Sequence, residues 1–257
     1  MDEEIRAHYE SGVELDRLAK GHSRLEFART KELLDRFLPP APARVLDVGG
    51  GPGAYASWLA DRGYDVRLVD AHPLHVEQAL DRAAGRFTAV EGDARHLDEP
   101  DQSHDAVLML GPLYHLTDRS DRLRALTEAR RVLRPGGLLA AAAISRFASL
   151  LDGLAAGYLS DPEFRAIVER DLAEGQHRNP GARLEYFTTA YFHRVEELET
   201  EVGEAGFALE TVFGVEGPGW LVHQEATEEV LDVARAVEGE PTVIGTSAHL
   251  LAIARRP

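Results

Sequence analysis

The fold is decided by the stretch Arg44-Val45-Leu46-Asp47-Val48-Gly49-Gly50-Gly51-Pro52-Gly53. Its first five residues are typical of a buried β-strand, and its glycines allow a sharp turn and a close backbone approach to a ligand. The following residues, Ala54–Arg62, are expected to form a helix whose N-terminus offers unpaired N–H groups. The stretch satisfies the nucleotide-binding pattern G-x-G-x-x-A and lacks the G-K-S/T ending of an ATP- or GTP-binding loop. We therefore expect a strand–loop–helix unit that binds a ligand.

Short apolar runs alternate with amphipathic stretches beyond this unit. The expected strands are Arg44–Val48, Asp65–Val69, Phe87–Glu91, Asp105–Leu110, Leu138–Ile144, Ala208–Val215 and Ala248–Ala254. The run Leu138–Ile144 is apolar throughout, which is typical of a parallel strand covered on both faces. Strand–helix alternation of this kind predicts an α/β fold with a doubly wound sheet.

The order of the predicted helices and strands also divides the chain into segments. We expect an N-terminal helical cap at 1–38, a Rossmann-like cofactor-binding core at 39–145, a helical lid insertion at 146–193, and the remainder of the core at 194–257 with a helical insertion near 221–240. The cap and the insertions are candidate lid segments.

Composition excludes several classes of function. The 257 residues include 28 Lys and Arg against 44 Asp and Glu, a formal charge of −16, which argues against broad contact with nucleic acid. There is no cysteine, so disulfides, thiolate zinc sites, iron–sulfur clusters and a Cys nucleophile are excluded. No apolar stretch reaches the roughly 18–20 residues that span a bilayer, and the acidic start Met1–Glu4 is unlike a secretory signal. We expect a soluble cytoplasmic protein without nucleic-acid or membrane partners, and the sequence leaves its oligomeric state open.

Three aspartates end strands on the same side of the expected sheet. Asp47 at the first strand suits a cationic group and would oppose a pyrophosphate. Asp70 ends the second strand, where a carboxylate can accept hydrogen bonds from two ribose hydroxyls. Asp93 follows the third strand, in position to accept from the exocyclic amine of a base. For Asp70 and Asp93, capping of a turn is the alternative interpretation.

In this order and spacing the motifs resemble those of the class I S-adenosylmethionine-dependent methyltransferases. The matching features are the acidic residue and glycines of Asp47-x-Gly49-x-Gly51-x-Gly53, the aspartate at position 70, the turn Gly92-Asp93-Ala94, and Ala129–Gly137 before the fifth strand. The resemblance implies a mostly parallel seven-stranded sheet with an antiparallel last strand and S-adenosyl-L-methionine as the cofactor. It also implies cofactor contacts through Asp47 and the loop Gly49, Gly50 and Gly51 (methionine portion), Asp70 (ribose), Ala71, Asp93 and Ala94 (adenine), and the backbone of Leu110 (amino group).

Residues that carry chemistry are harder to assign. Methyl transfer mainly requires alignment of the acceptor with the methyl group and exclusion of water. His115 follows the fourth strand and is the candidate general base, although it could instead be a surface or capping residue beside Asp118. The loop lacks the Asn/Asp-Pro-Pro-Tyr pattern of relatives that methylate nucleobase or glutamine nitrogens.

Further candidates come from outside the core. Tyr9 and Arg24 are candidates for closing over the cofactor. Candidates for an aromatic acceptor pocket are Tyr114, Tyr186, Tyr191 and Trp220, although aromatic residues often belong to the core. The sequence contains no H-E-x-x-H pattern, and we expect no metal site.

The leading hypothesis is methyl transfer to an oxygen or nitrogen nucleophile of a small molecule. A NAD-dependent oxidoreductase and a non-catalytic cofactor-binding module remain as alternatives.

Overall fold

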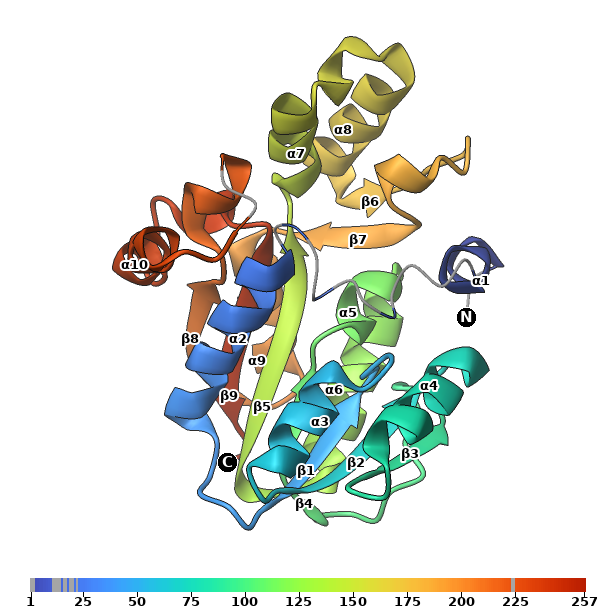
Figure 1. Cartoon of the computed structure of the whole chain (residues 1–257), viewed down its shortest axis with the longest axis vertical. Coiled ribbons are helices and arrows are strands. Elements are labelled where there is room, and N and C mark those ends of the chain that lie inside the picture. The colour runs from blue at the N-terminus through green and yellow to red at the C-terminus, as the bar shows by residue number, and fades with distance from the viewer. Residues whose placement is uncertain (1–2, 11–14, 16–17, 19–20, 22, 223–224) are drawn as a thin grey trace.

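A computed structural model gives the structure of the chain, and it describes residues 3–10, 15, 18, 21, 23–222 and 225–257 (Figure 1). The expected cap at 1–38 and the insertion near 221–240 therefore lie partly outside the described residues. Within the described part, helices and strands alternate from residue 44 to residue 145. This confirms the α/β class.

The main sheet has the strand order β3-β2-β1-β4-β5-β9-β8. The strands are β1 (Arg44–Val48), β2 (Asp65–Asp70), β3 (Thr88–Glu91), β4 (His104–Met109), β5 (Leu133–Ser145), β8 (Ala208–Gly214) and β9 (His249–Arg255). Neighbours from β3 to β5 are parallel, whereas β9 runs antiparallel to both β5 and β8. The mostly parallel seven-stranded sheet with an antiparallel last strand is thus confirmed.

Two short strands extend this sheet where only helices were expected. They are β6 (Gln176–His177) and β7 (Ala190–His193), which pair antiparallel with each other. β7 also pairs in parallel with the end of β5, through Ile144 and Ser145. β5 is longer than the expected strand Leu138–Ile144 at both ends, and Ser145 at its carboxyl end pairs with β7.

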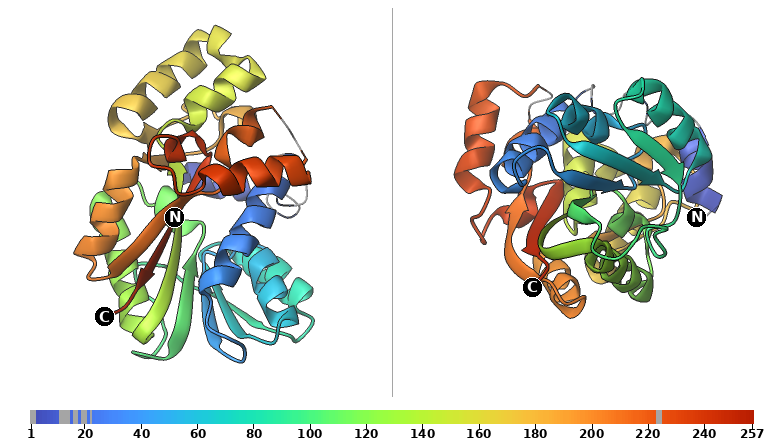
Figure 2. Two further views of the ribbon diagram at one scale, coloured as in Figure 1. Left: turned by 90° about the vertical axis from the view of Figure 1, so that its left-hand side faces the viewer. Right: turned by 90° about the horizontal axis from the view of Figure 1, so that it is seen from below.

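Helices cover both faces of the sheet (Figure 2). They are α1 (Glu3–Glu10), α2 (Ser23–Phe37), α3 (Ala54–Asp61), α4 (Pro73–Ala83), α5 (Pro112–His115), α6 (Arg119–Val132), α7 (Ala148–Ala156), α8 (Pro162–Glu174), α9 (Val195–Glu204) and α10 (Glu228–Val237). Buried side chains of α2, α3 and α4 pack on one face, and those of α6 and α9 pack on the other. Because both faces are covered, the central strands are buried along almost their whole length.

The carboxyl ends of the parallel strands point toward the helices of the expected lid. Figure 1 shows β5 leading to α7 and α8, with α1 beside the same edge of the sheet. The strand order reverses between β1 and β4, and in open α/β sheets ligands bind outside the carboxyl ends at such a point. Within the described residues, no helix is long and apolar enough to cross a membrane.

Candidate functional site

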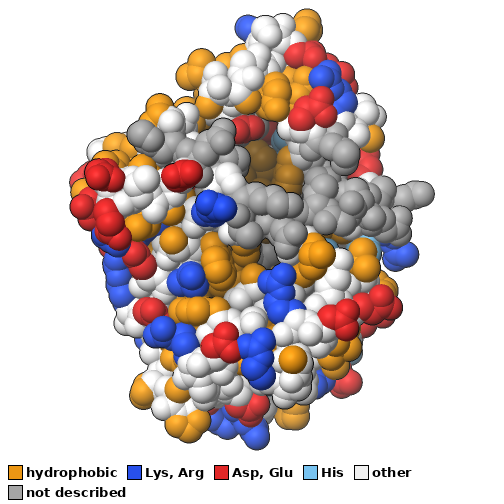
Figure 3. Space-filling view, in the orientation of Figure 1, with side chains coloured by type: hydrophobic (Ala, Val, Ile, Leu, Met, Phe, Trp, Pro, Cys, Tyr) orange, Lys and Arg blue, Asp and Glu red, His pale blue; other side chains and the backbone are white. Residues whose placement is uncertain are grey.

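A cavity of about 870 Å³ lies at the carboxyl ends of β1, β2 and β4. Its wall includes the predicted cofactor residues Asp47, Gly49, Gly50, Gly51, Asp70, Ala71, Asp93, Ala94 and Leu110, and also Tyr9, Tyr114 and His115. The space-filling view shows a separate hollow with hydrophobic side chains below α7 and α8 (Figure 3). The structure therefore brings together residues from α1, the glycine loop, the ends of β1, β2 and β4, and the turn after β3.

The glycine loop is held tightly between its neighbours. At Gly49 the backbone is left-handed, with φ of 68°, and a Cβ there would lie 2.6 Å from Cγ of Pro112. At Gly50 a Cβ would lie 2.6 Å from Oδ2 of Asp47. The loop therefore requires glycine at both positions, and it passes directly over the Asp47 carboxylate.

Asp47 is a fully buried carboxylate with no cationic partner among the described residues. The residue is 0% exposed, and neither carboxylate oxygen has a partner among the described residues. Burial, and then the charge of nearby Asp70, raise the pKa of Asp47 to about 7. A buried polar group of this kind is normally satisfied, so a cationic ligand group in the cavity fits this position.

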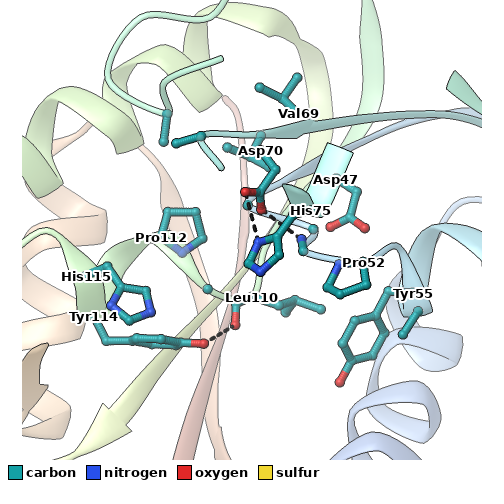
Figure 4. Close-up of a pocket in the computed structure, with 18 of the residues that line it drawn as sticks. Asp47, Pro52, Tyr55, Val69, Asp70, His75, Leu110, Pro112, Tyr114 and His115 are labelled. Carbon is teal, nitrogen blue, oxygen red and sulfur yellow. Dashed lines mark hydrogen bonds and ion pairs between the residues drawn. The ribbon is translucent and has the colours of Figure 1, made fainter. Parts of the chain in front are cut away.

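Asp70 is buried at the end of β2 and is surrounded by donors (Figure 4). Its Oδ2 accepts from the backbone N–H of Gly51 at 2.8 Å. Its Oδ1 accepts from the backbone N–H of His72 at 2.8 Å and lies 3.2 Å from Nδ1 of His75. These contacts tie the second strand end to the glycine loop and to the start of α4, and they fix the carboxylate at the cavity wall.

The adenine side differs from the expectation in one respect. Asp93 lines the cavity, but its carboxylate is paired with the guanidinium of Arg95, at 2.5 Å from Nη2. The same guanidinium contacts Asp121 at 2.6 Å. The hydrogen bonds from Arg95 hold the pKa of Asp93 below its ordinary value, so its carboxylate is ionised near neutral pH.

His115 lies on the short helix α5, on the cavity wall beside Tyr114. Its Nε2 hydrogen-bonds with the hydroxyl of Tyr9, which comes from the separate helix α1. Tyr114 is buried and donates its hydroxyl to the Leu110 carbonyl oxygen at 3.3 Å. Tyr9 and His115 thus lie side by side on the cavity wall, and their roles as a closing residue and a base stay predictions.

Four predicted site residues lie elsewhere. Arg24 is exposed on α2 and does not line the cavity. Tyr186 is buried in the lid and donates to Asp161, whereas the ring of Tyr191 packs against a guanidinium from α6. Trp220 is buried near α10 and donates to a backbone carbonyl. These three aromatic residues thus do not line this cavity, and their part in an acceptor pocket stays a prediction.

Other residues take their place on the cavity wall. Phe27 of α2 and Tyr55 of α3 lie there with ring centroids 5.0 Å apart, and Nζ of Lys31 sits 4.1 Å from the Phe27 centroid. His75 also lines the cavity. The close spacing of His75 to Asp70 was visible in the sequence, whereas nothing local marks Phe27 or Tyr55 as neighbours.

One cluster could hold a metal ion. Within the described residues, Glu26, Glu216 and His249 bring ligand atoms within 4.8 Å of one another. Glu216 hydrogen-bonds with both Nδ1 and the backbone N–H of His249, at 2.6 and 3.0 Å. These bonds already give Glu216 and His249 a structural pairing, and the absence of a metal site stays a prediction.

Comparison with known proteins agrees with this geometry. Residues 45–137 match the family model described as a methyltransferase domain. An uncharacterized methyltransferase of Mycobacterium tuberculosis is 41% identical over 108 residues, which is 42% of each chain. The malonyl-[acyl-carrier protein] O-methyltransferase of Geobacter sulfurreducens is 42% identical over 181 residues, 67% of this chain and 58% of that protein.

The solved structures extend the likeness of fold to most of the chain. An S-adenosylmethionine-dependent methyltransferase from Mesorhizobium loti superposes with a TM-score of 0.62 at 20% identity, covering 90% of this chain and 100% of that one. The chain spans only 42–46% of the length of several curated relatives that it matches. These findings do not favour an oxidoreductase. Residues 45–137 of this chain thus match a methyltransferase domain, and the fold is that of S-adenosylmethionine-dependent methyltransferases of known structure.

Proposed function

We propose that this chain is an enzyme that transfers a methyl group to an oxygen or nitrogen nucleophile of a small molecule. The observation that carries the proposal is the convergence of Asp47, Asp70 and the glycine loop on one cavity that also contains His115. Its volume of about 870 Å³ lies within the usual range of small-molecule sites, which suits a cofactor with a small acceptor.

The binding groups each have a separate role in this proposal. Bound S-adenosyl-L-methionine supplies an electrophilic methyl group on a sulfonium. Asp70 accepts from the ribose, and the backbone around Gly49–Gly51 and the buried Asp47 carboxylate receive the cationic methionine portion. Ala71, Ala94 and Leu110 give the adenosine its walls.

His115 is the proposed proton acceptor for the nucleophile. It lies at the end of β4 with Tyr114, and its hydrogen bond to Tyr9 fixes the ring at the cavity wall. An imidazole titrates near neutrality, so it can take a proton from a hydroxyl group as the methyl group is transferred, or from an ammonium group before the transfer, because only the free amine has the lone pair that attacks. Closure by Tyr9 would keep water away from the reacting atoms.

Ligand binding and turnover test different parts of the proposal. S-adenosylhomocysteine should raise the melting temperature of the protein, whereas NAD(H) should not, because a ligand that binds the native state stabilises it. Stabilisation by NADH alone would contradict the assignment. A screen of hydroxyl- and amine-bearing small molecules with methyl-labelled cofactor should then yield a methylated product. Binding without transfer to any acceptor would indicate a non-catalytic module instead.

A further inference from the structure

His75 has an unsatisfied atom beside the predicted ribose anchor. It lies in the first turn of α4, is 4% exposed and lines the cavity. Its Nδ1 lies 3.2 Å from Oδ1 of Asp70, and its Nε2 is buried without a hydrogen-bond partner among the described residues. Figure 4 shows the ring between the Asp70 carboxylate and the cavity.

The pairing with Asp70 determines what Nε2 can do. A carboxylate only accepts hydrogen bonds, so Nδ1 of His75 carries the hydrogen that points to Asp70. In the neutral imidazole the other nitrogen is then an acceptor. Buried acceptors are normally satisfied, and this one therefore calls for a donor from a bound molecule.

Most hydrogen-bond acceptor sites of the Asp70 carboxylate are already occupied by protein donors. A carboxylate offers about four lone-pair sites. Three are taken, by the backbone N–H groups of Gly51 and His72 and by Nδ1 of His75. One site on Oδ2 remains, so Asp70 can accept from one ribose hydroxyl and the second hydroxyl needs another acceptor.

We propose that His75 binds the ribose of the cofactor together with Asp70, accepting one hydroxyl through Nε2 while Oδ2 of Asp70 accepts the other. The ring of Tyr9 packs against His75 at 4.7 Å between centroids and covers this pair. His75 thus acts both as a ligand-binding residue and as a support for Asp70. The assignment deepens the proposed function, because it rests on binding of the same cofactor.

Calorimetric titration with S-adenosylhomocysteine and its 2′-deoxy and 3′-deoxy analogues tests this pairing. His75→Asn keeps a donor toward Asp70 and removes the acceptor at Nε2, and His75→Gln returns an acceptor near that position. We expect His75→Asn to weaken S-adenosylhomocysteine binding about tenfold, the usual effect of a lost hydrogen bond. The analogue that lacks the hydroxyl bound by His75 should bind wild type and His75→Asn equally. The other analogue should lose about tenfold in affinity in His75→Asn. His75→Gln should recover part of the affinity.

The control is Glu77→Gln, on the exposed face of the same helix, which should bind as wild type does. Thermal unfolding of each variant verifies that it is folded. An equal loss of affinity for both analogues in His75→Asn would overturn the proposal, because His75 would then only support Asp70. Unchanged affinity of His75→Asn for S-adenosylhomocysteine would also overturn it. If His75→Asn does not fold, His75→Ala takes its place, and its loss of affinity should still be smaller for one deoxy analogue than for the other. Failure of wild type to bind S-adenosylhomocysteine at all would instead refute the cofactor assignment.

Discussion

Replacing Asp47 with asparagine should stabilise the ligand-free protein at neutral pH while weakening its affinity for the cofactor. The carboxylate is fully buried and its oxygens lack partners among the described residues, and its pKa is raised to about 7. The folded state therefore binds this proton more tightly than the unfolded chain, in which an aspartate has a pKa of about 3.9. The stability linked to this proton is present below the unfolded pKa and is lost as the pH rises to about 7.

The size of the effect follows from the difference between the two pKa values. One pKa unit corresponds to about 1.4 kcal/mol, so a difference of about 3 corresponds to about 4 kcal/mol over the whole range. Between pH 5 and pH 7 the wild type should lose about 2 kcal/mol of unfolding free energy relative to Asp47→Asn, and above pH 8 the difference should level off. Asparagine has nearly the same shape and does not titrate, so the comparison isolates the charge.

Urea unfolding of both proteins at half-unit steps from pH 5 to pH 8.5 measures this difference. Asp81→Asn, an exposed aspartate on α4, is the matched control and should show no such pH dependence. Saturating S-adenosylhomocysteine should reduce the difference, because its ammonium group would lower the pKa of Asp47. A free-energy difference between wild type and Asp47→Asn that stays constant with pH would refute the reasoning.

Three further substitutions test the glycine loop, a buried ion pair and the proposed general base. Gly50→Ala places a Cβ 2.6 Å from the Asp47 carboxylate, so it should lower stability by about 1–3 kcal/mol and weaken S-adenosylhomocysteine binding, as measured by denaturant unfolding and calorimetry. Arg122→Met removes the guanidinium that forms a buried ion pair with Glu201, and urea unfolding should show a loss of about 3–5 kcal/mol; a smaller loss would mean that water reaches the pair. His115→Asn should lower turnover about 10²–10⁴-fold with little change in cofactor affinity, and the wild-type rate should rise with pH through a group near neutrality. Intact turnover in His115→Asn would show that His115 is not the base.

The core could be predicted because its signals are local. The strand Arg44–Val48 and the start of the following helix at Ala54 coincide with the structure, since an apolar run, a glycine loop and an amphipathic stretch follow each other directly. The predicted contacts of Asp70 with the ligand also depend on its position at a strand end, which the alternation of elements already determines. Short-range patterns therefore carry the cofactor half of the site.

The lid could not be predicted in the same way. β7 has only four residues, Ala190–His193, and it exists because it pairs with the end of β5, about fifty residues earlier in the chain. Likewise, Tyr186 packs within its own insertion and Trp220 packs against Leu25 of α2 and Val230 of α10, which depends on how these segments fold and not on the aromatic residues alone. Long-range packing of this kind leaves no periodic signal in the sequence.

The cavity combines residues inside the family match with residues outside it, and this affects how the methyl acceptor can be identified. The family match ends at residue 137, whereas the cavity is completed by Tyr9 of α1 and Phe27 of α2, both of which precede it. The residues that hold the cofactor and those that complete the cavity therefore come from different parts of the chain. Substitutions in α1 and α2 can reshape the wall without disturbing Asp47 or Asp70. Similarity over residues 45–137 consequently says little about Tyr9 and Phe27, and the acceptor has to be sought through these residues as well as through Tyr114 and His115.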